Sequence, residues 1–287
     1  MSKESIVISF DHEKIAGVLF KTDNDQETPA PGLVICHGAF EYKENFFELA
    51  EYLAAQGISA IVIDMPGHGE STGERFHINI DLWVRSIRAA VDQLAGHPEI
   101  DEHRIGAFGF SSGGTAVLEA ALADPRLKAL ITLDATVRNY LNLWDTFTFK
   151  TLNAVGILKK KVTGSDLRLK LLPVLKSARV AHDPAVNQSI ISDPKMIDAY
   201  SAFPLPGAAP CAFVDTIRHI SKISIPTLVL HGEEDHVDPP ETAGILFETL
   251  TCEKAIELIP QSGHCGHLDT NRHKIMQLTA DWALKHL

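Results

Sequence analysis

The sequence predicts an α/β fold in which a mostly parallel sheet has helices on both faces and contains an inserted, mainly helical segment. Two observations lead to this prediction. Short β-branched apolar runs alternate with helix-period segments through residue 136, and the alternation returns after residue 221. Residues 137–220 instead contain helix-like stretches and no run typical of a buried strand. We therefore predict a core of residues 1–136 and 221–287 with a helical lid at residues 137–220.

The first elements are predicted by short-range patterns. Two apolar runs, at residues 5–10 and 14–20, are separated by Asp11-His12-Glu13 and indicate an antiparallel hairpin. The continuous apolar run at residues 33–36 is typical of a strand buried on both faces. Residues 45–56 have apolar side chains at helical spacing and end before a glycine, which indicates a helix.

The remaining core elements repeat these patterns. Further strands are predicted at residues 58–64, 104–110, 127–133, 226–230 and 254–259. Helices are predicted at residues 80–95, 112–123, 240–250 and 271–284. Since parallel strands need a crossover connection that is usually a helix, this alternation implies parallel pairing.

The inserted segment is predicted to lie over the carboxyl edge of the sheet, where open α/β sheets bind ligands. Its helix-like stretches are residues 141–158 and 167–175. The first has eight apolar residues close to helical spacing, which we expect to pack onto the sheet or, in part, to line an acyl pocket. They are Leu141, Leu143, Trp144, Phe147, Phe149, Leu152, Val155 and Leu158.

Composition excludes several classes of protein. The 287 residues are 45% hydrophobic and 22% charged, which is ordinary for a globular protein. No stretch resembles a signal peptide or reaches the ~20 apolar residues of a membrane-spanning helix. The four scattered cysteines favour reduced thiols and a cytoplasmic protein. The formal charge of −11 disfavours nucleic acid as a partner, and no pattern indicates an oligomeric state.

Charge is distributed unevenly along the chain. Residues 137–220 contain eleven Lys and Arg against six Asp and no Glu, so this segment has a net charge of +5 and the rest has −16. A basic lid can attract an anionic substrate group, or it can complement an acidic core. The run Lys159-Lys160-Lys161 is also compatible with a solvated helix end or a weak contact to anionic lipid.

One serine lies in a context typical of an activated nucleophile. The sequence Gly109-Phe110-Ser111-Ser112-Gly113 ends the predicted strand at residues 104–110 and opens the predicted helix after it, which matches G-x-S-x-G in its strand-turn-helix context. Such a turn is so tight that only small residues fit around the serine. We therefore predict Ser111 as a nucleophile.

A serine hydroxyl needs an imidazole to accept its proton, and the imidazole needs an acid to hold its tautomer. His264 follows a glycine after the last predicted strand and is the predicted base, with His267 as the alternative. Asp235 lies in the loop after residues 226–230 and is the predicted acid. The same loop offers three competing carboxylates, those of Glu233, Glu234 and Asp238.

These motifs resemble the α/β-hydrolase family over nearly the whole chain. The order Ser, Asp, His is that family's order, so the resemblance implies Ser111, Asp235 and His264 as its catalytic triad. The turn His37-Gly38-Ala39 is similar to the family's oxyanion turn, which implies the backbone N–H groups of Ala39 and Ser112 as the oxyanion hole.

Other motifs narrow the resemblance to one branch. Residues 64–71 resemble the family's D-x-x-G-x-G-x-S loop, a family marker without a chemical role. The HGGG esterase motif is absent, which favours the branch with a helical lid before the acid strand. Ser111 differs from the Asp of the family's dehalogenases and epoxide hydrolases and from the Cys of its dienelactone hydrolases. No spacing suggests a metal, flavin, nucleotide or pyridoxal cofactor, so we expect none.

The sequence therefore predicts an esterase-like or lipase-like serine hydrolase that cleaves a carboxylic ester of a small or medium acyl group. Its expected partner is a small acyl molecule, with an anionic group if the basic lid recruits one. The alternatives are an acyl thioesterase or acyltransferase with the same triad, a peptidase of the proline-iminopeptidase type, and a non-catalytic ligand-binding protein on the same fold.

Overall fold

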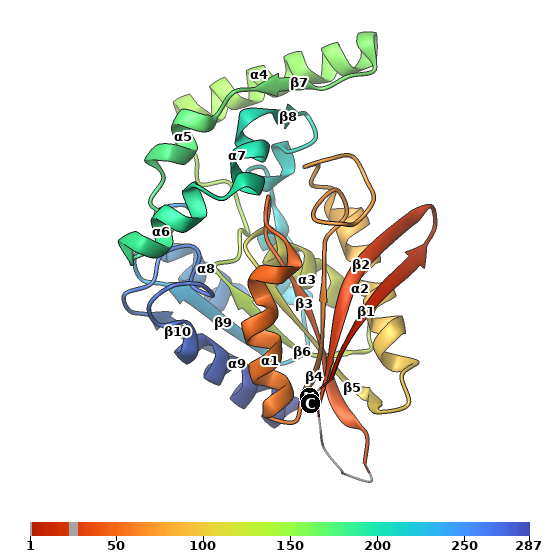
Figure 1. The fold of residues 1–287 in the computed structure, drawn as a ribbon. Helices are drawn as coiled ribbons and strands as arrows, with labels where there is room; N and C mark the ends of the chain where they lie inside the picture. The colour runs from red at the N-terminus through yellow and green to blue at the C-terminus, as the bar shows by residue number, and fades with distance from the viewer. Residues whose placement is uncertain (1, 23–27) are drawn as a thin grey trace.

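The computed structural model describes residues 2–22 and 28–287 and has a mostly parallel sheet with helices on both faces, as predicted (Figure 1). The strand order is β1-β2-β4-β3-β5-β6-β9-β10. The strands are β1 (Ser2–Phe10), β2 (Glu13–Lys21), β3 (Ala30–Cys36), β4 (Ser59–Ile63), β5 (Ile100–Phe110), β6 (Leu127–Leu133), β9 (Thr227–Gly232) and β10 (Lys254–Ile259). Strand β2 pairs antiparallel with β1 and β4, and the other described pairs of this sheet are parallel.

Two layers of helices cover the sheet. Helices α2 (Ile80–Ala95), α3 (Ser112–Ala123) and α8 (Glu241–Thr249) share a core with one face of the sheet. Helices α1 (Phe47–Ala55) and α9 (Arg272–His286) share a core with the other. Strands β3 and β4 are buried along their whole length, which explains why their sequences are continuously apolar.

Strand β5 begins earlier than its sequence pattern predicts. Ile100 pairs with Ala30 of β3, and the register then shifts before Ile105 pairs with Gly32. The polar residues between them are partly or fully exposed, so this part of the strand lacks the apolar signature of a buried strand. The buried end of β5 leads directly into α3.

The inserted segment lies over the carboxyl edge of the sheet, as Figure 1 shows. Its elements are α4 (Leu143–Thr163), β7 (Leu167–Leu169), α5 (Leu172–Ser177), α6 (Pro184–Ile191), α7 (Pro194–Ser201) and β8 (Phe203–Leu205). Short 3-10 turns at Ala209–Cys211, Thr216–Arg218 and Ile220–Lys222 lead back to the core.

Two expectations for this segment were wrong. Residues 167–175 do not form one helix, because β7 pairs antiparallel with β8 before α5 begins. Leu167-Arg168-Leu169 alternates apolar and charged residues, which is the strand period. The segment also contains a buried strand, because all three residues of β8 are buried. A strand this short gives no recognisable apolar pattern in the sequence.

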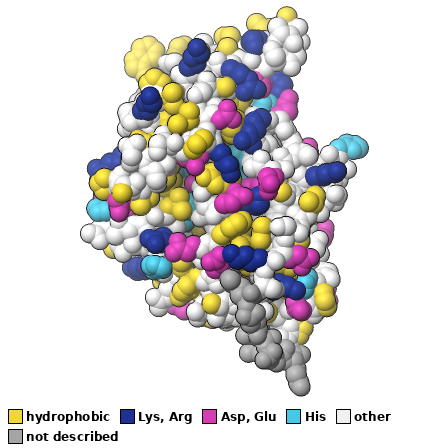
Figure 2. Space-filling model, viewed as in Figure 1, with side chains coloured by type: hydrophobic (Ala, Val, Ile, Leu, Met, Phe, Trp, Pro, Cys, Tyr) yellow, Lys and Arg dark blue, Asp and Glu magenta, His cyan; other side chains and the backbone are white. Residues whose placement is uncertain are grey.

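We expected the apolar residues of α4 to pack onto the sheet or to line a pocket, but only some of them do. Phe149 and Leu152 contact the core, but Leu143, Trp144 and Phe147 are 91%, 75% and 63% exposed. The eight apolar positions span more than one side of the helix, so only part of them can face inward. The outward side contributes to the hydrophobic side chains at the top of Figure 2.

A glycine fixes how closely α4 approaches β8. A Cβ on Gly156 would stand 2.9 Å from the backbone oxygen of Leu205, so Gly156→Val should force the two elements apart. We expect a loss of about 1–3 kcal/mol in the free energy of unfolding, measured by urea denaturation. Ala154→Val adds a similar side chain on the exposed side of the same helix and should cost less than about 1 kcal/mol. Equal losses in the two variants would contradict this packing.

Candidate active site

The turn between β5 and α3 holds Ser111 in an unusual backbone conformation. Its φ of 51° and ψ of −120° lie outside the regions that L-residues prefer. Glycines make this conformation possible. A Cβ on Gly109 would stand 2.3 Å from the oxygen of Gly113, and a Cβ on Gly113 would stand 2.4 Å from the oxygen of His37. The turn therefore projects the Ser111 hydroxyl at the N-terminus of α3, next to the turn that follows β3.

The structure brings Ser111, His264 and Asp235 together in one hydrogen-bonded chain. His264 Nε2 lies 3.1 Å from Ser111 Oγ, and His264 Nδ1 lies 2.8 Å from Asp235 Oδ2. All three residues are buried. They come from loops after β5, β9 and β10, whose carboxyl ends meet at one edge of the sheet. The imidazole is thus placed to accept a proton from the serine while the carboxylate holds its other nitrogen.

The electrostatic environment favours a charged imidazole beside a charged carboxylate. Burial lowers the pKa of His264, but the neighbouring Asp235 carboxylate raises it more, and the pKa of His264 lies above its usual value. Burial raises the pKa of Asp235, but His264 and His231 lower it more, and this carboxyl stays ionised. The pair therefore stabilises an imidazolium, which is the form that results when the neutral imidazole takes the serine proton during acyl transfer.

The competing residues lie elsewhere. His267 stacks on the Phe46 ring at 4.2 Å and lies 3.4 Å from Glu41, rather than against Ser111. Asp238 accepts a hydrogen bond from the Thr136 hydroxyl at 2.6 Å. Glu234 pairs with Arg179 and His182, and Glu233 is exposed.

The two residues predicted to form the oxyanion hole lie at the same cavity as Ser111. Ala39 and Ser112 both line it, and within the described residues neither N–H donates to a protein acceptor. A Cβ on Gly38 would stand 2.9 Å from the Ser111 side chain, so the turn at residues 37–39 packs closely against the serine. The arrangement can stabilise negative charge that develops beside Ser111.

The loop that resembles the family marker supports this turn. The backbone N–H of Met65 donates to His37 Nε2 at 2.9 Å, which ties the loop to the turn. Asp64 is fully buried and accepts hydrogen bonds from the Lys43 backbone and ammonium, each at 2.8 Å, and from the Glu70 N–H at 2.9 Å. The loop therefore has a structural role at the edge of the site.

The cavity above Ser111 has a volume of about 410 Å³, and both the core and the inserted segment line it. The core contributes Phe40 and Phe110, and the inserted segment contributes apolar residues that include Leu141, Ile190 and Met196. A space of this size and character suits a small organic ligand with an apolar part.

The sequence did not indicate a buried polar pair next to the cavity. Glu41 lines the cavity, and both Glu41 and His267 are buried. Among the described residues, Glu41 Oε2 and His267 Nδ1 have no hydrogen-bond partner. Glu41 follows the oxyanion turn by two residues and His267 follows His264 by three, so proximity to the motifs was the only available signal.

The lysine run of the inserted segment does not line the cavity. Lys160 pairs with Glu74 at 2.7 Å and with Asp166 at 3.2 Å, and Lys159 donates to the Ser165 hydroxyl and the Asp166 carbonyl. Arg138 does line the cavity, and its guanidinium lies 4.9 Å from the Tyr140 ring centre. The contact between Lys160 and Glu74 joins the basic segment to the acidic core.

Comparison with known proteins identifies related chains. The family model described as serine aminopeptidase, S33, matches residues 27–271. A 31.7 kDa Escherichia coli protein of the traX-finO intergenic region is 26% identical over 275 residues, covering 90% of this chain and 91% of its own. The monoacylglycerol lipase of Mycolicibacterium smegmatis is 23% identical over 272 residues, covering 90% of each chain. The α/β hydrolase GrgF of Penicillium superposes with a TM-score of 0.83 at 18% identity, covering 100% of this chain and 99% of its own.

The Lys43 ion pair gives a prediction about stability. Its ammonium and the Asp64 carboxylate are 5% and 0% exposed, so Lys43→Met leaves a buried carboxylate without its cation. We expect a loss of about 3–5 kcal/mol in the free energy of unfolding, measured by urea denaturation. Lys21→Met removes a surface pair with Glu99 and should cost less than about 1 kcal/mol. A loss at Lys43 no larger than that at Lys21 would show that the buried pair does not support the loop.

Proposed function

This chain belongs to the serine aminopeptidase S33 family of α/β hydrolases, and we propose that it hydrolyses carboxylic esters of small or medium acyl groups through an acyl-serine intermediate. The predicted class, a carboxylic ester hydrolase, is confirmed by its lipase-named relatives. The observation that carries the proposed mechanism is the contact of Ser111 Oγ with His264 Nε2 at 3.1 Å, with His264 held by Asp235.

In the proposed mechanism, Ser111 Oγ attacks the ester carbonyl carbon while His264 Nε2 takes the hydroxyl proton. The carbonyl oxygen becomes an oxyanion, which the N–H groups of Ala39 and Ser112 stabilise. His264 then returns the proton to the leaving alcohol, and the acyl group stays on the serine. A water molecule, deprotonated by His264, attacks the acyl-serine and releases the acid. Asp235 keeps the imidazole tautomer correct throughout.

The cavity supports a small or medium acyl group. Its apolar lining would hold an acyl chain, and its volume of about 410 Å³ is at the small end of ligand sites. We propose that residues 137–220 act as a lid over this cavity, because their side chains supply one of its walls, including Tyr140 and Tyr200.

The net charge of the lid is +5, but few of its basic side chains are placed to meet a substrate in the cavity. Lys159 and Lys160 are engaged within the lid or with the core, so they are not the groups that would meet a substrate. Arg138 lies at the cavity, and among the described residues no carboxylate pairs with it. If the substrate has an anionic group, Arg138 is the proposed contact.

The description of the family model favours a second candidate, an aminopeptidase that uses the same serine. An amide and an ester pass through the same acyl-serine, so the leaving group distinguishes the two activities. A thioesterase or acyltransferase would share the site as well.

Location and further partners are also proposals. Across residues 2–22 and 28–287, no helix has the length and apolar character that crossing a bilayer requires. The four cysteines are unpaired, which supports the proposed cytoplasmic location. The charge of −11 supports a small acyl molecule rather than nucleic acid as the partner.

A panel of acyl esters, acyl thioesters and aminoacyl amides tests the proposed reaction. We expect the highest kcat/KM for an ester of a small or medium acid, and Ser111→Ala should remove nearly all of this activity because the members of a triad act together. Circular dichroism checks that the variant is folded. Turnover of aminoacyl amides in preference to esters would instead favour the peptidase.

The raised pKa of His264 gives a pH dependence. His264 must be neutral to accept the serine proton, so kcat/KM should rise with pH through a midpoint above 6.5. Asp235→Asn removes the charge that raises this pKa, so the midpoint should fall and kcat should drop by about four orders of magnitude. Asp238→Asn keeps a group that can bond Thr136 and should have a much smaller effect. A larger loss in Asp238→Asn would reassign the acid.

A further inference from the structure

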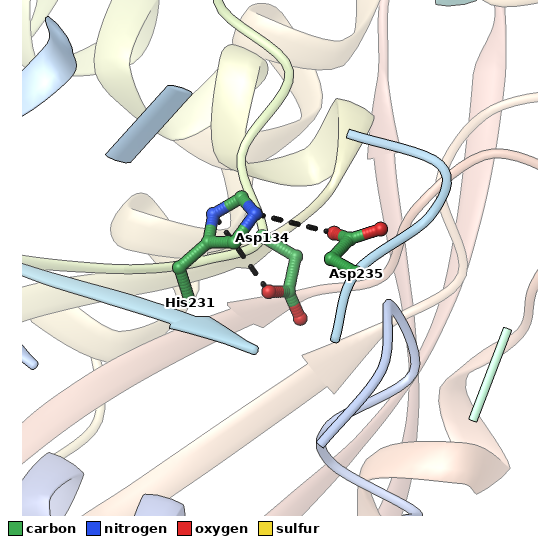
Figure 3. Close-up of side chains that lie close together, drawn as sticks. All are labelled: Asp134, His231 and Asp235. Carbon is green, nitrogen blue, oxygen red and sulfur yellow. Dashed lines mark ion pairs between the residues drawn. The ribbon is translucent and has the colours of Figure 1, made fainter. Parts of the chain in front are cut away.

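A second imidazole lies against the candidate acid. His231, near the end of β9, is buried, and Figure 3 shows its ring between Asp134 and Asp235. Its Nε2 is 3.3 Å from Asp235 Oδ2 and 2.9 Å from the backbone carbonyl oxygen of Asp238. Its Nδ1 is 3.8 Å from Asp134 Oδ1. No step of the mechanism above uses His231 or Asp134.

These contacts determine where the His231 proton lies. A backbone carbonyl oxygen only accepts hydrogen bonds, so Nε2 must carry a proton and donate it. Nδ1 faces the Asp134 carboxyl group. An additional proton on this pair can lie either on Nδ1 beside a carboxylate or on a carboxylic acid beside Nδ1. Both arrangements keep an N–H on Nε2, aimed toward Asp238 and Asp235.

Asp134 is held in place for this contact. It follows β6 with a φ of 50°, and its Oδ1 accepts the Gly232 N–H at 2.8 Å. Its Oδ2 is buried and has no hydrogen-bond partner among the described residues. Burial raises the pKa of the Asp134 carboxyl group. Burial lowers the pKa of His231, but the neighbouring Asp134 raises it more, so the pKa of His231 lies above its usual value. The pair is thus suited to retain a proton near neutral pH.

Each carboxylate oxygen of Asp235 has two neighbouring donor groups. Oδ1 accepts the backbone N–H groups of Val237 at 2.7 Å and Asp238 at 3.0 Å. Oδ2 lies between the imidazoles of His264 and His231, at 2.8 Å and 3.3 Å. A carboxylate buried this completely needs such donors to remain ionised. His231 therefore contacts the same carboxylate oxygen that His264 contacts.

We propose that His231, whose Nε2 proton is fixed by the Asp238 carbonyl oxygen, is a positioning residue that holds Asp235 Oδ2 against His264. This inference rests on the proposed acyl-serine mechanism. His231 does not contact Ser111, so its effect reaches the serine through Asp235 and His264. The titratable groups that face it come from the loops after β6, β9 and β10, and they are Asp134, Asp235, Asp238 and His264.

The same atoms could be considered as metal ligands, since one atom each from Asp134, His231 and Asp235 lies within 4.8 Å of the others. A metal ligand nitrogen cannot carry a proton. Nε2 of His231 donates its proton to a carbonyl oxygen, and Asp235 Oδ2 already pairs with His264. A protonated Nε2 therefore fits this cluster better than a bound cation, and EDTA should leave the rate unchanged.

Two variants with the same amide group but different reach test the proposal. The amide nitrogen of Gln lies close to the position of His Nε2, so His231→Gln should keep a donor toward Asp235 and retain kcat within about fivefold. His231→Asn places its amide near Nδ1 and should lower kcat by about 10- to 100-fold, the range expected for a lost hydrogen bond to a charged group. KM for a model ester should stay within about twofold in both.

Controls separate positioning from packing. His286 lies in α9, away from the site, with a side chain that is 8% exposed, and His286→Gln should leave kcat unchanged. In proton NMR spectra, the wild type should show a protected, downfield N–H signal that disappears in both His231 variants. Thermal unfolding checks that each variant is folded. The proposal is overturned if His231→Asn keeps the wild-type kcat, if Gln and Asn impair it equally, or if EDTA abolishes activity.

The positioning role of His231 can be tested even if the proposed esterase activity is wrong. If the wild type hydrolyses no ester, the same variants are compared by the rate at which a fluorophosphonate labels Ser111. That rate should fall in His231→Asn and be largely kept in His231→Gln. A labelling rate that is the same in both variants and the wild type would overturn the positioning role.

Discussion

The backbone conformation of Ser111 is the constraint on which the site depends. A non-glycine residue held in such a conformation costs about 1–3 kcal/mol, so the surrounding packing must maintain it. Gly109 and Gly113 allow β5, α3 and the turn after β3 to approach more closely than any Cβ would permit. Ser111 and the turn at residues 37–39 are thereby fixed as one unit. The loops after β9 and β10 then need only bring Asp235 and His264 to a position that this unit already defines.

That edge of the sheet buries an unusual number of titratable groups. They are Asp134, Asp235, Asp238, His231 and His264, all of which are buried. Each isolated charge would be costly, but here carboxyl and imidazole groups alternate in contact with one another. Burial raises the pKa of Asp134 and of Asp238, whereas the two imidazoles keep Asp235 ionised. Negative charge is therefore concentrated on the carboxylate that contacts His264.

Most of the core could be predicted from the sequence because most parallel strands contain an apolar run that leads into a turn. The meeting of Ser111, His264 and Asp235 was predictable for the same reason, since the carboxyl ends of parallel strands share an edge. His231 and Asp134 belong to no local motif, and their contact depends on β6 lying beside β9. The inserted segment at residues 137–220 was less predictable, because α4 leaves much of its apolar surface exposed and hydrophobic period alone cannot show which side packs.

The most direct test of the central claim is covalent trapping of the serine. Intact-protein and peptide mass spectrometry after treatment with a fluorophosphonate should show one adduct, on Ser111. His264→Ala should slow the labelling by several orders of magnitude, because the imidazole that removes the serine proton is gone. Absence of the adduct on Ser111 in the folded wild type, or labelling that is as fast without His264, would contradict the account.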